Sequence, residues 1–227
     1  MQIKQVIWDW NGTLLDDGWV GLEVMNEILE ERGLKKIEDI NIYREIFCFP
    51  VIEYYKRAGI ELDRDSFEEL SEIYIEKYDR ISQTCGLRKE AREVLETVKA
   101  KYAPQMILSA SKTDYLTRQV EKYGILHYFA EILGLDDYYA GSKVELGERW
   151  MKAHPEKKGK AVMIGDTTHD AEVAKRMDCV CLLVEGGHQS RQVLETSGMV
   201  VLESLSEIPA ALKRLENSQP PFRGEGG

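Results

Sequence analysis

The sequence predicts an α/β fold, in which a doubly wound, Rossmann-like parallel sheet carries an inserted α-helical cap domain. Short apolar runs recur between helical patterns, the first run ends in an aspartate, and one long segment without strands interrupts the alternation. Alternating strands and helices are typical of a parallel sheet that is covered by helices. With 227 residues, 43% of them hydrophobic, the chain is long enough to bury such a core.

The predicted strands are five short apolar runs, which cover 6–8, 106–108, 161–164, 179–184 and 199–202. Each run is almost entirely apolar, as expected for strands that are buried on both faces. Helical patterns between them cover 91–101, 114–123, 170–177 and 189–196. The four cysteines match neither a zinc pattern nor a disulfide framework, and Cys179 and Cys181 alternate along the fourth run as strand residues do.

Residues 16–85 contain no convincing strand and are predicted to form the cap. Leu22, Met25, Ile28 and Leu29 make one helical stripe, the apolar residues between 67 and 81 make another, and Pro50 favours the start of a shorter helix. We therefore expect a core domain of residues 1–15 and 86–215. Residues 216–227 are predicted to be a disordered tail, because Pro and Gly are frequent there.

The charge balance limits the partners. The formal net charge is −10 and the isoelectric point is about 5.1, which argues against nucleic acid and anionic membranes. The chain shows no secretory leader pattern and no apolar run near the roughly 18 residues of a membrane span. We expect a cytoplasmic protein; the sequence leaves its oligomeric state open.

Polar residues follow three of the predicted strands. Asp9 comes directly after the first, Ser109 after the second and Asp166 after the third. Because the carboxyl ends of parallel strands meet at one edge of a sheet, these side chains are expected to converge. Lys143, in a predicted loop, would add positive charge there, and Asp170 would orient a ligand or hold Lys143.

This combination suits phosphoryl transfer. Two carboxylates offer hard oxygen ligands for Mg²⁺, and an aspartate can act as a nucleophile. A serine and a lysine can hold phosphoryl oxygens. Each feature alone also has a purely structural explanation. Asn-Gly and Gly-Asp are common turn dipeptides, and a lysine in a loop is usually solvated. Their occurrence together, at strand ends and in this order, favours a site.

These residues resemble the haloacid dehalogenase-like (HAD) hydrolase superfamily. Its first motif, usually Asp-x-Asp-Gly-Thr and an apolar residue, reads Asp-Trp-Asn-Gly-Thr-Leu at 9–14. Ser109 matches the second motif, Lys143 is the candidate for the third, and Gly165 to Asp170 match the fourth. The resemblance covers residues 3 to about 205. A helical cap between the first two motifs is similar to the phosphoglycolate phosphatase-like branch.

The resemblance implies a HAD-type fold and a role for each matched residue. Asp9 would be the nucleophile and a Mg²⁺ ligand, and Asp166 and the backbone carbonyl of Asn11 would be further ligands. Ser109 and Lys143 would bind the phosphoryl group. The implied activity is hydrolysis of a small phosphorylated metabolite through an aspartyl-phosphate.

Asn11 departs from the family pattern, which has an aspartate there as general acid and base. An amide can do neither, and such help is typically worth roughly 10²- to 10⁴-fold in rate. We expect weak turnover of alkyl phosphates and a smaller effect on acyl and aryl phosphates. His169 is a candidate substitute, since imidazole titrates near neutral pH, although a solvent-facing or helix-capping histidine fits the sequence as well.

Two other functions remain open. A phosphate-binding or regulatory protein with weakened catalysis would also explain Asn11. Phosphonoacetaldehyde hydrolase, which cleaves a carbon–phosphorus bond, has a similar Asp-Trp-x-Gly-Thr motif, but its cap lysine has no counterpart at the matching place, and Lys56 lies several residues beyond it. Haloacid dehalogenases need no metal, so the carboxylates of the fourth motif argue against them.

Some neighbouring residues receive structural roles. Asp16 and Asp17 are predicted to cap the first helix of the cap domain. His188 follows a strand in a loop, where it either faces the cleft or, as the sequence favours, lies exposed. Phe47, Cys48 and Phe49 are predicted either to line the substrate pocket or to pack in the core.

Overall fold

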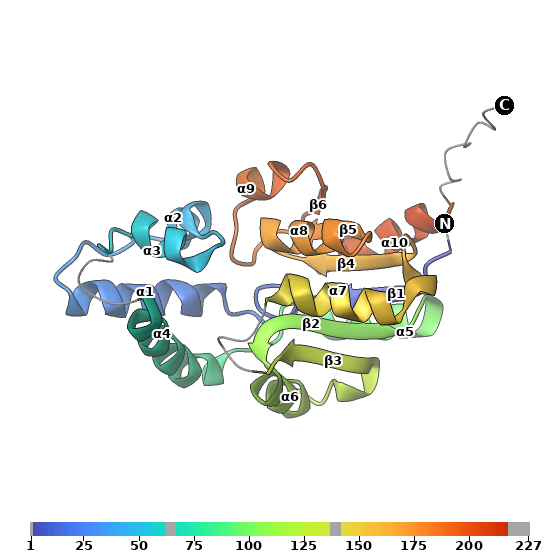
Figure 1. Ribbon diagram of the computed structural model, residues 1–227, viewed down its shortest axis with the longest axis horizontal. Helices are drawn as coiled ribbons and strands as arrows, with labels where there is room; N and C mark the ends of the chain where they lie inside the picture. Colours follow the sequence, from blue (N-terminus) through green and yellow to red (C-terminus); the bar gives the residue numbers. More distant parts are fainter. Residues whose placement is uncertain (1, 62–66, 137–141, 218–227) are drawn as a thin grey trace.

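A six-stranded parallel sheet forms the centre of the protein (Figure 1). The structure is a computed structural model and describes residues 2–61, 67–136 and 142–217. The strand order is β3-β2-β1-β4-β5-β6, and every neighbouring pair is parallel. The strands are β1 (Gln5–Trp8), β2 (Gln105–Lys112), β3 (Phe129–Leu135), β4 (Ala161–Gly165), β5 (Val180–Val184) and β6 (Val200–Leu202). This confirms the predicted doubly wound α/β fold.

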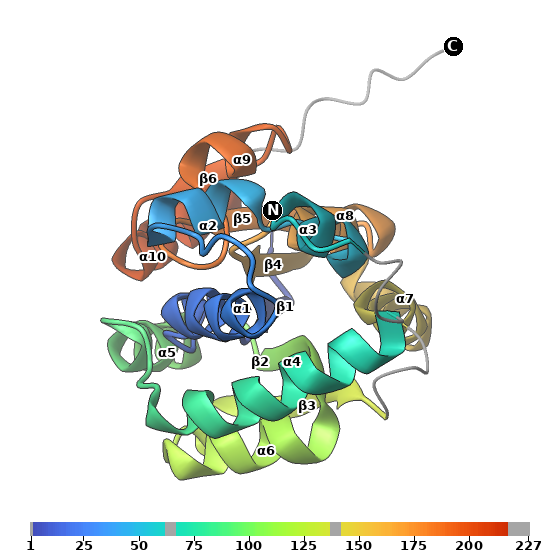
Figure 2. The ribbon, with the colours of Figure 1, turned by 90° about the vertical axis from the view of Figure 1, so that its left-hand side faces the viewer.

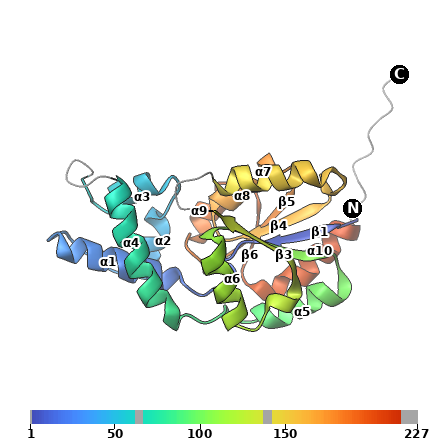
Figure 3. The same cartoon turned by 60° about the horizontal axis from the view of Figure 1, so that its bottom comes forward.

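Helices cover both faces of the sheet (Figure 3). Side chains that alternate along β1 are buried on opposite faces, with Val6 and Trp8 in one apolar cluster and Ile7 in the other. The first face is covered by α5 (Ala91–Lys101), α6 (Thr113–Lys122) and α10 (Ile208–Asn217). The second face is covered by α7 (Lys143–Ala153), α8 (Thr168–Arg176) and α9 (Arg191–Glu195). The apolar runs of the sequence are continuous because both faces are buried.

Four described helices of the insert lie between β1 and α5 and extend beyond the carboxyl ends of the strands (Figures 1 and 2). They are α1 (Gly18–Glu31), α2 (Ile40–Ile46), α3 (Val51–Arg57) and α4 (Phe67–Ile81). Pro50 is the N-cap residue of α3, as its position in the sequence predicts. The chain leaves and re-enters the core through two adjacent segments, which are joined by hydrogen bonds from Asp16 N to Gly86 O and from Arg88 N to Leu14 O, 3.0 and 2.9 Å long.

The structure differs from the sequence-based expectation in three places. Strand β3 was not predicted, because Glu131 interrupts its apolar residues and the strand lies half-exposed at the sheet edge. Lys143 does not lie in a loop: it is the first residue of α7, which begins with a capping box of Ser142 and Glu145. Strand β2 continues past Leu108 to Lys112, so Ser109 lies within it, at a point where the register with β3 shifts.

The last described helix extends two residues into the segment that the sequence predicts to be a disordered tail. Glu216 and Asn217 belong to α10, and residues 218–227 lie outside the described residues. Within the described part of the chain, no helix combines the length and the apolar character that crossing a membrane requires.

Candidate active site

A pocket of about 370 Å³ is lined by residues from the carboxyl edge of the sheet and from the inserted helices. Every site residue that the sequence predicts lines it: Asp9, Asn11, Ser109, Lys143, Asp166, His169 and Asp170. Parallel strands bring these distant residues together, because β1 lies between β2 and β4.

The carboxylates of Asp9, Asp166 and Asp170 form a buried cluster. One oxygen from each lies within 4.8 Å of the others. The Thr13 hydroxyl lies 3.1 Å from Asp9 Oδ2 and 2.9 Å from Asp166 Oδ1, so it connects the first two. The sequence does not assign this role to Thr13, although the residue belongs to the first motif.

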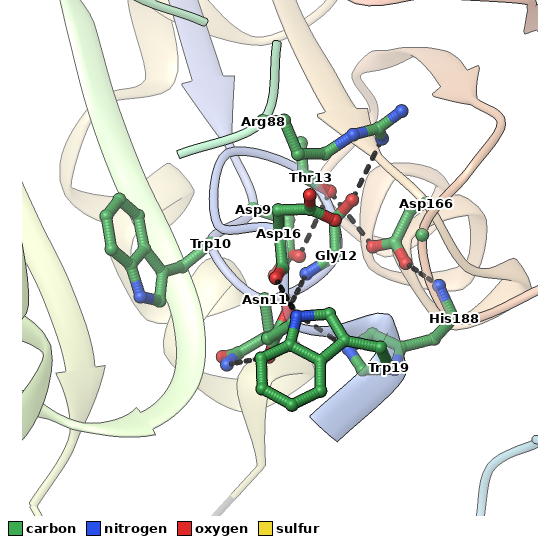
Figure 4. Close-up of polar contacts among 12 residues, drawn as sticks. Asp9, Trp10, Asn11, Gly12, Thr13, Asp16, Trp19, Arg88, Asp166 and His188 are labelled. Atoms are coloured by element: carbon green, nitrogen blue, oxygen red, sulfur yellow. Dashed lines mark hydrogen bonds and ion pairs between the residues drawn. The ribbon is translucent and has the colours of Figure 1, made fainter. Parts of the chain in front are cut away.

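Two glycines allow the loops to approach Asp166 closely (Figure 4). A Cβ atom on either Gly12 or Gly187 would lie 2.1 Å from Asp166 Oδ2, and Gly12 also has a φ of +71°. The backbone N–H of His188 donates to the same oxygen at 2.6 Å. Arg88 donates to Gly12 O at 2.9 Å and so fixes the loop after Asp9.

Lys143 links the other two carboxylates of the cluster. Its Nζ donates to Asp9 Oδ1 and, at 2.5 Å, to Asp170 Oδ1. The other oxygen of Asp170 accepts hydrogen bonds from the Thr167 N–H and hydroxyl, 3.0 and 2.7 Å long, at the start of α8. Asp170 is therefore held in place on both sides and itself positions Lys143 against Asp9.

Burial without full charge compensation governs the electrostatics of the cluster. Burial raises the pKa of Asp9 to about 8, and the charges of Asp170 and Asp166 add to this, while Lys143 opposes it. Burial also raises the pKa of Asp166, with Asp170 contributing and His188 opposing. The pKa of Asp170 is lowered, since Lys143 and the Thr167 hydroxyl outweigh its burial.

The donor set of the cluster fits a divalent metal ion. Asp9 and Asp166 offer hard carboxylate oxygens that are adjacent and buried. A cation between them would favour their ionised forms and offset the effect of burial. Both oxygens of Asp170 are engaged, one by Lys143 and the other by Thr167, whereas Lys143 contacts only one oxygen of Asp9. Asp9 and Asp166 are therefore the residues that could hold the ion.

Asn11 joins three parts of the chain. Its Nδ2 donates to Asp17 Oδ2 at 2.9 Å and to the Tyr78 hydroxyl at 2.7 Å, and its Oδ1 accepts from Ser111 Oγ at 2.8 Å. Ser111 lies in β2, and Tyr78 comes from α4 of the insert. The amide thus connects the loop after β1 to both the sheet and the inserted helices.

Asp17 has a different role from the predicted helix cap. It occupies the N-cap position of α1, but its side chain makes no capping hydrogen bond. Instead it is completely buried and accepts from Gly12 N at 2.5 Å, from Asn11 and from the Tyr78 hydroxyl. The Asp17 side chain therefore stabilises the tight turn after Asp9 rather than the first turn of α1.

His188 is buried and lines the pocket, so of its two predicted positions the favoured exposed one is wrong and the one that faces the cleft is confirmed. Its Nε2 lies 3.4 Å from Asp17 Oδ1, and its Nδ1 lies 2.7 Å from the Tyr43 hydroxyl. Burial lowers its pKa, but the charges of Asp17 and Asp166 outweigh this and raise the pKa to about 9. One signal was available, because His188 follows β5 at the same edge as the other strand-end residues.

His169 lies at the pocket on another side. Its ring stacks on Phe49, with the centroids 4.5 Å apart, and its Nδ1 lies 3.3 Å from Glu172. Burial, with Lys143 next, lowers its pKa. Phe47 and Phe49 both line the pocket, and Phe47 also packs on His188 in the apolar core. Tyr78 and Tyr43 carried no sequence signal that distinguishes them from core aromatics.

The haloacid dehalogenase-like hydrolase family matches residues 6–184 of this chain. The chain belongs to this family. The match covers the sheet from β1 to β5, the inserted helices and the whole acidic cluster.

Curated relatives of this HAD-like hydrolase include two phosphoglycolate phosphatases. The protein from Vibrio parahaemolyticus is 21% identical, over 91% of this chain and 94% of its own length. The protein from Caulobacter vibrioides is 24% identical, over 95% and 93%.

Solved structures share its fold. A predicted phosphatase from Clostridium acetobutylicum has a TM-score of 0.76 at 18% identity and covers 94% of this chain and 100% of its own. A haloacid dehalogenase-like family protein from Streptococcus pneumoniae has a TM-score of 0.78 at 21% identity, with 92% and 98% covered.

Proposed function

We propose that this HAD-like hydrolase is a Mg²⁺-dependent phosphohydrolase that acts on a small phosphorylated metabolite through an aspartyl-phosphate on Asp9. The observation that carries the proposal is the position of Asp9, which lines a pocket between Lys143 on one side and the Thr13–Asp166 pair on the other. The phosphoglycolate phosphatase relatives support the same reaction class.

In this reaction, a carboxylate oxygen of Asp9 attacks phosphorus, and the leaving oxygen departs with the electron pair of its P–O bond. Water then hydrolyses the aspartyl-phosphate and releases phosphate. Lys143 donates to Asp9 before attack and offsets phosphoryl charge. Ser109, a buried residue of the same pocket lining, offers a hydroxyl for a phosphoryl oxygen.

A magnesium ion held by Asp9, Asp166 and the carbonyl of Asn11 would supply electrostatic stabilisation of the phosphoryl oxygens. The chain's own residues prepare this position. The Thr13 hydroxyl lies within hydrogen-bonding distance of both carboxylates, and the backbone N–H of His188 donates to Asp166 Oδ2.

Asn11 limits which phosphate esters are hydrolysed well. Its amide donates to Asp17 and Tyr78 but has no acidic proton to give a leaving alkoxide. Acyl and aryl phosphates have leaving groups that depart as stable anions. We expect them to be the better substrates.

The test is release of phosphate from acetyl phosphate and para-nitrophenyl phosphate in the presence of Mg²⁺. Asp9→Asn should reduce kcat/KM at least about 10²-fold, the scale of losing a positioned catalytic group. Asp16→Asn is the matched control, because Asp16 is an exposed aspartate of the same loop. Equal activity in the wild type and Asp9→Asn would contradict the proposal.

A phosphate-binding or regulatory role is the second candidate, and the amide of Asn11 is the observation that favours it. It predicts saturable binding of inorganic phosphate without Asp9-dependent hydrolysis. The carbon–phosphorus hydrolase is less well supported, because Lys56 is half-exposed on α3, pairs with Glu53 at 2.7 Å and is not among the residues that line the pocket. Borohydride trapping of substrate on a cap lysine would favour it.

A further inference from the structure

The inserted helices give the pocket an aromatic wall. Four of its rings form a continuous row, which starts at Phe67 and passes through Tyr55 and Tyr74 to Tyr78. Consecutive ring centroids are 6.1, 6.1 and 6.4 Å apart, and the last pair is nearly parallel at 13°. We call these four residues the aromatic row.

The aromatic row connects the surface to the reacting groups. Phe67 at one end is 37% exposed. At the other end, the Tyr78 hydroxyl accepts from Asn11, two residues from Asp9. A group attached to a phosphate beside Asp9 would therefore extend along the rings. Flat aromatic groups pack well on such faces, in offset-stacked or edge-to-face arrangements.

The charges around the pocket disfavour a second anionic group on the substrate. Five aspartates line it, and Lys143 is already shared by two of them. Lys112 is the other lining lysine, and no arginine lines the pocket within the described part of the chain. The His188 imidazolium is a third cation, so the lining side chains carry five formal negative charges against three positive ones. Before a metal ion is counted, a carboxylate such as that of phosphoglycolate would therefore meet more negative than positive charge from the protein.

Resting on the proposed phosphohydrolase function, we propose that the substrate is a phosphate monoester of an uncharged aromatic alcohol of the phenol class, held along the aromatic row. Two independent observations agree on this leaving group. Tyr55 is buried within the row, and the less buried Phe67, Tyr74 and Tyr78 offer stacking surface. Asn11 offers no acidic proton, which a phenolate does not need.

The reaction balances without a further reactant. The bond between an Asp9 oxygen and phosphorus forms, and the P–O bond to the aryl group breaks with its electron pair on the aryl oxygen. Water then attacks the aspartyl-phosphate, restores the carboxylate and gives phosphate. Its protons end on phosphate and the phenolate.

Binding of phosphonates, which are not hydrolysed, tests the substrate class apart from catalysis. Benzylphosphonate imitates phenyl phosphate, 3-phosphonopropionate imitates phosphoglycolate, and propylphosphonate is the alkyl control. Calorimetric titration in Mg²⁺ should give a Kd for benzylphosphonate at least about tenfold below the other two, which is the scale of one or two aromatic contacts. Equal or tighter binding of either of the others would overturn the proposal.

Substitutions in the aromatic row test whether benzylphosphonate binds there. Phe67→Ala and Tyr74→Leu should each weaken benzylphosphonate about five- to tenfold and leave propylphosphonate within about twofold. Trp19→Ala is the matched control, since Trp19 is a 40% exposed ring of α1 outside the pocket lining. Unchanged benzylphosphonate binding in both row variants, folded by circular dichroism, would refute the proposed position.

Hydrolysis separates failure of this inference from failure of the proposed function. Without Asp9-dependent hydrolysis of acetyl phosphate, the function fails, whatever the order of phosphonate binding. Where acetyl phosphate is hydrolysed, kcat/KM for phenyl phosphate should exceed that for phosphoglycolate at least about 10²-fold. The reverse order would overturn the aromatic substrate class alone.

Discussion

Asn11→Asp is the substitution that most directly probes this site. The new carboxylate would lie where Nδ2 now lies 2.9 Å from Asp17 Oδ2, and two hydrogen bonds donated by Nδ2 would be lost. Two like charges at this distance repel by about 6 kcal/mol at an effective dielectric constant of 20. Keeping the new carboxyl protonated at pH 7 costs only about 4 kcal/mol, from an ordinary pKa near 4.

The new carboxyl therefore keeps its proton at neutral pH and donates to Asp17. A protonated acid beside Asp9 is what an alkyl leaving group needs, so kcat/KM for glycerol phosphate should rise roughly 10²- to 10⁴-fold. Acetyl phosphate, whose leaving group needs no proton, should change by less than about tenfold.

Stability should also become dependent on pH. The pKa of the new carboxyl is raised in the folded state, so the folded protein binds more protons than the unfolded chain above about pH 4. The free energy of unfolding should therefore fall as pH rises, by about 1.4 kcal/mol per unit until the folded-state pKa is passed.

The assays are phosphate release from both substrates and urea unfolding between pH 5 and about 8.5 in chelator. Asn11→Leu is the control, because it loses the same hydrogen bonds without adding a charge and should lose stability equally at every pH. If the stability of Asn11→Asp relative to Asn11→Leu did not fall as pH rises, the repulsion argument would be refuted. Unchanged glycerol phosphate turnover beside intact acetyl phosphate turnover would show that another group supplies the proton, and His169→Ala would then be the damaging change.

Three further outcomes are expected. Lys143→Met should abolish hydrolysis and, because it leaves two buried carboxylates without their cation, lower the free energy of unfolding in chelator by about 3–5 kcal/mol, as measured by urea titration. The raised pKa of His188, about 9, means that its pairing with Asp17 stabilises the fold fully below about pH 6.5 and is lost as pH rises through about 9; thermal unfolding should show this decline in the wild type and a smaller one in His188→Gln. Tyr54→Phe removes a buried hydroxyl that has no hydrogen-bond partner among the described residues, so Tm should stay equal or rise, by up to the equivalent of about 1 kcal/mol.

The sequence determined the sheet, most of its strands and the residues at its carboxyl edge. Strands that are buried on both faces can be recognised in the sequence as uninterrupted apolar runs, and a polar residue one or two positions after each run marks the sheet edge. Asp9, Ser109 and Asp166 could therefore be placed together from topology alone. The positive charge of Lys143 marks it as a candidate site residue, and the capping box of Ser142 and Glu145 is the sequence signal for its place at a helix start.

Only the tertiary structure decided the contacts that depend on neighbours distant in sequence. Asp17 was predicted to cap a helix because local rules favour it, yet Tyr78, 61 residues away, and His188 turn it into a buried acceptor beside Asn11. The aromatic row likewise exists only because α3 and α4 pack together over the pocket. Local periodicity reports which face of a helix is buried, but the partners on that face are fixed by packing between elements.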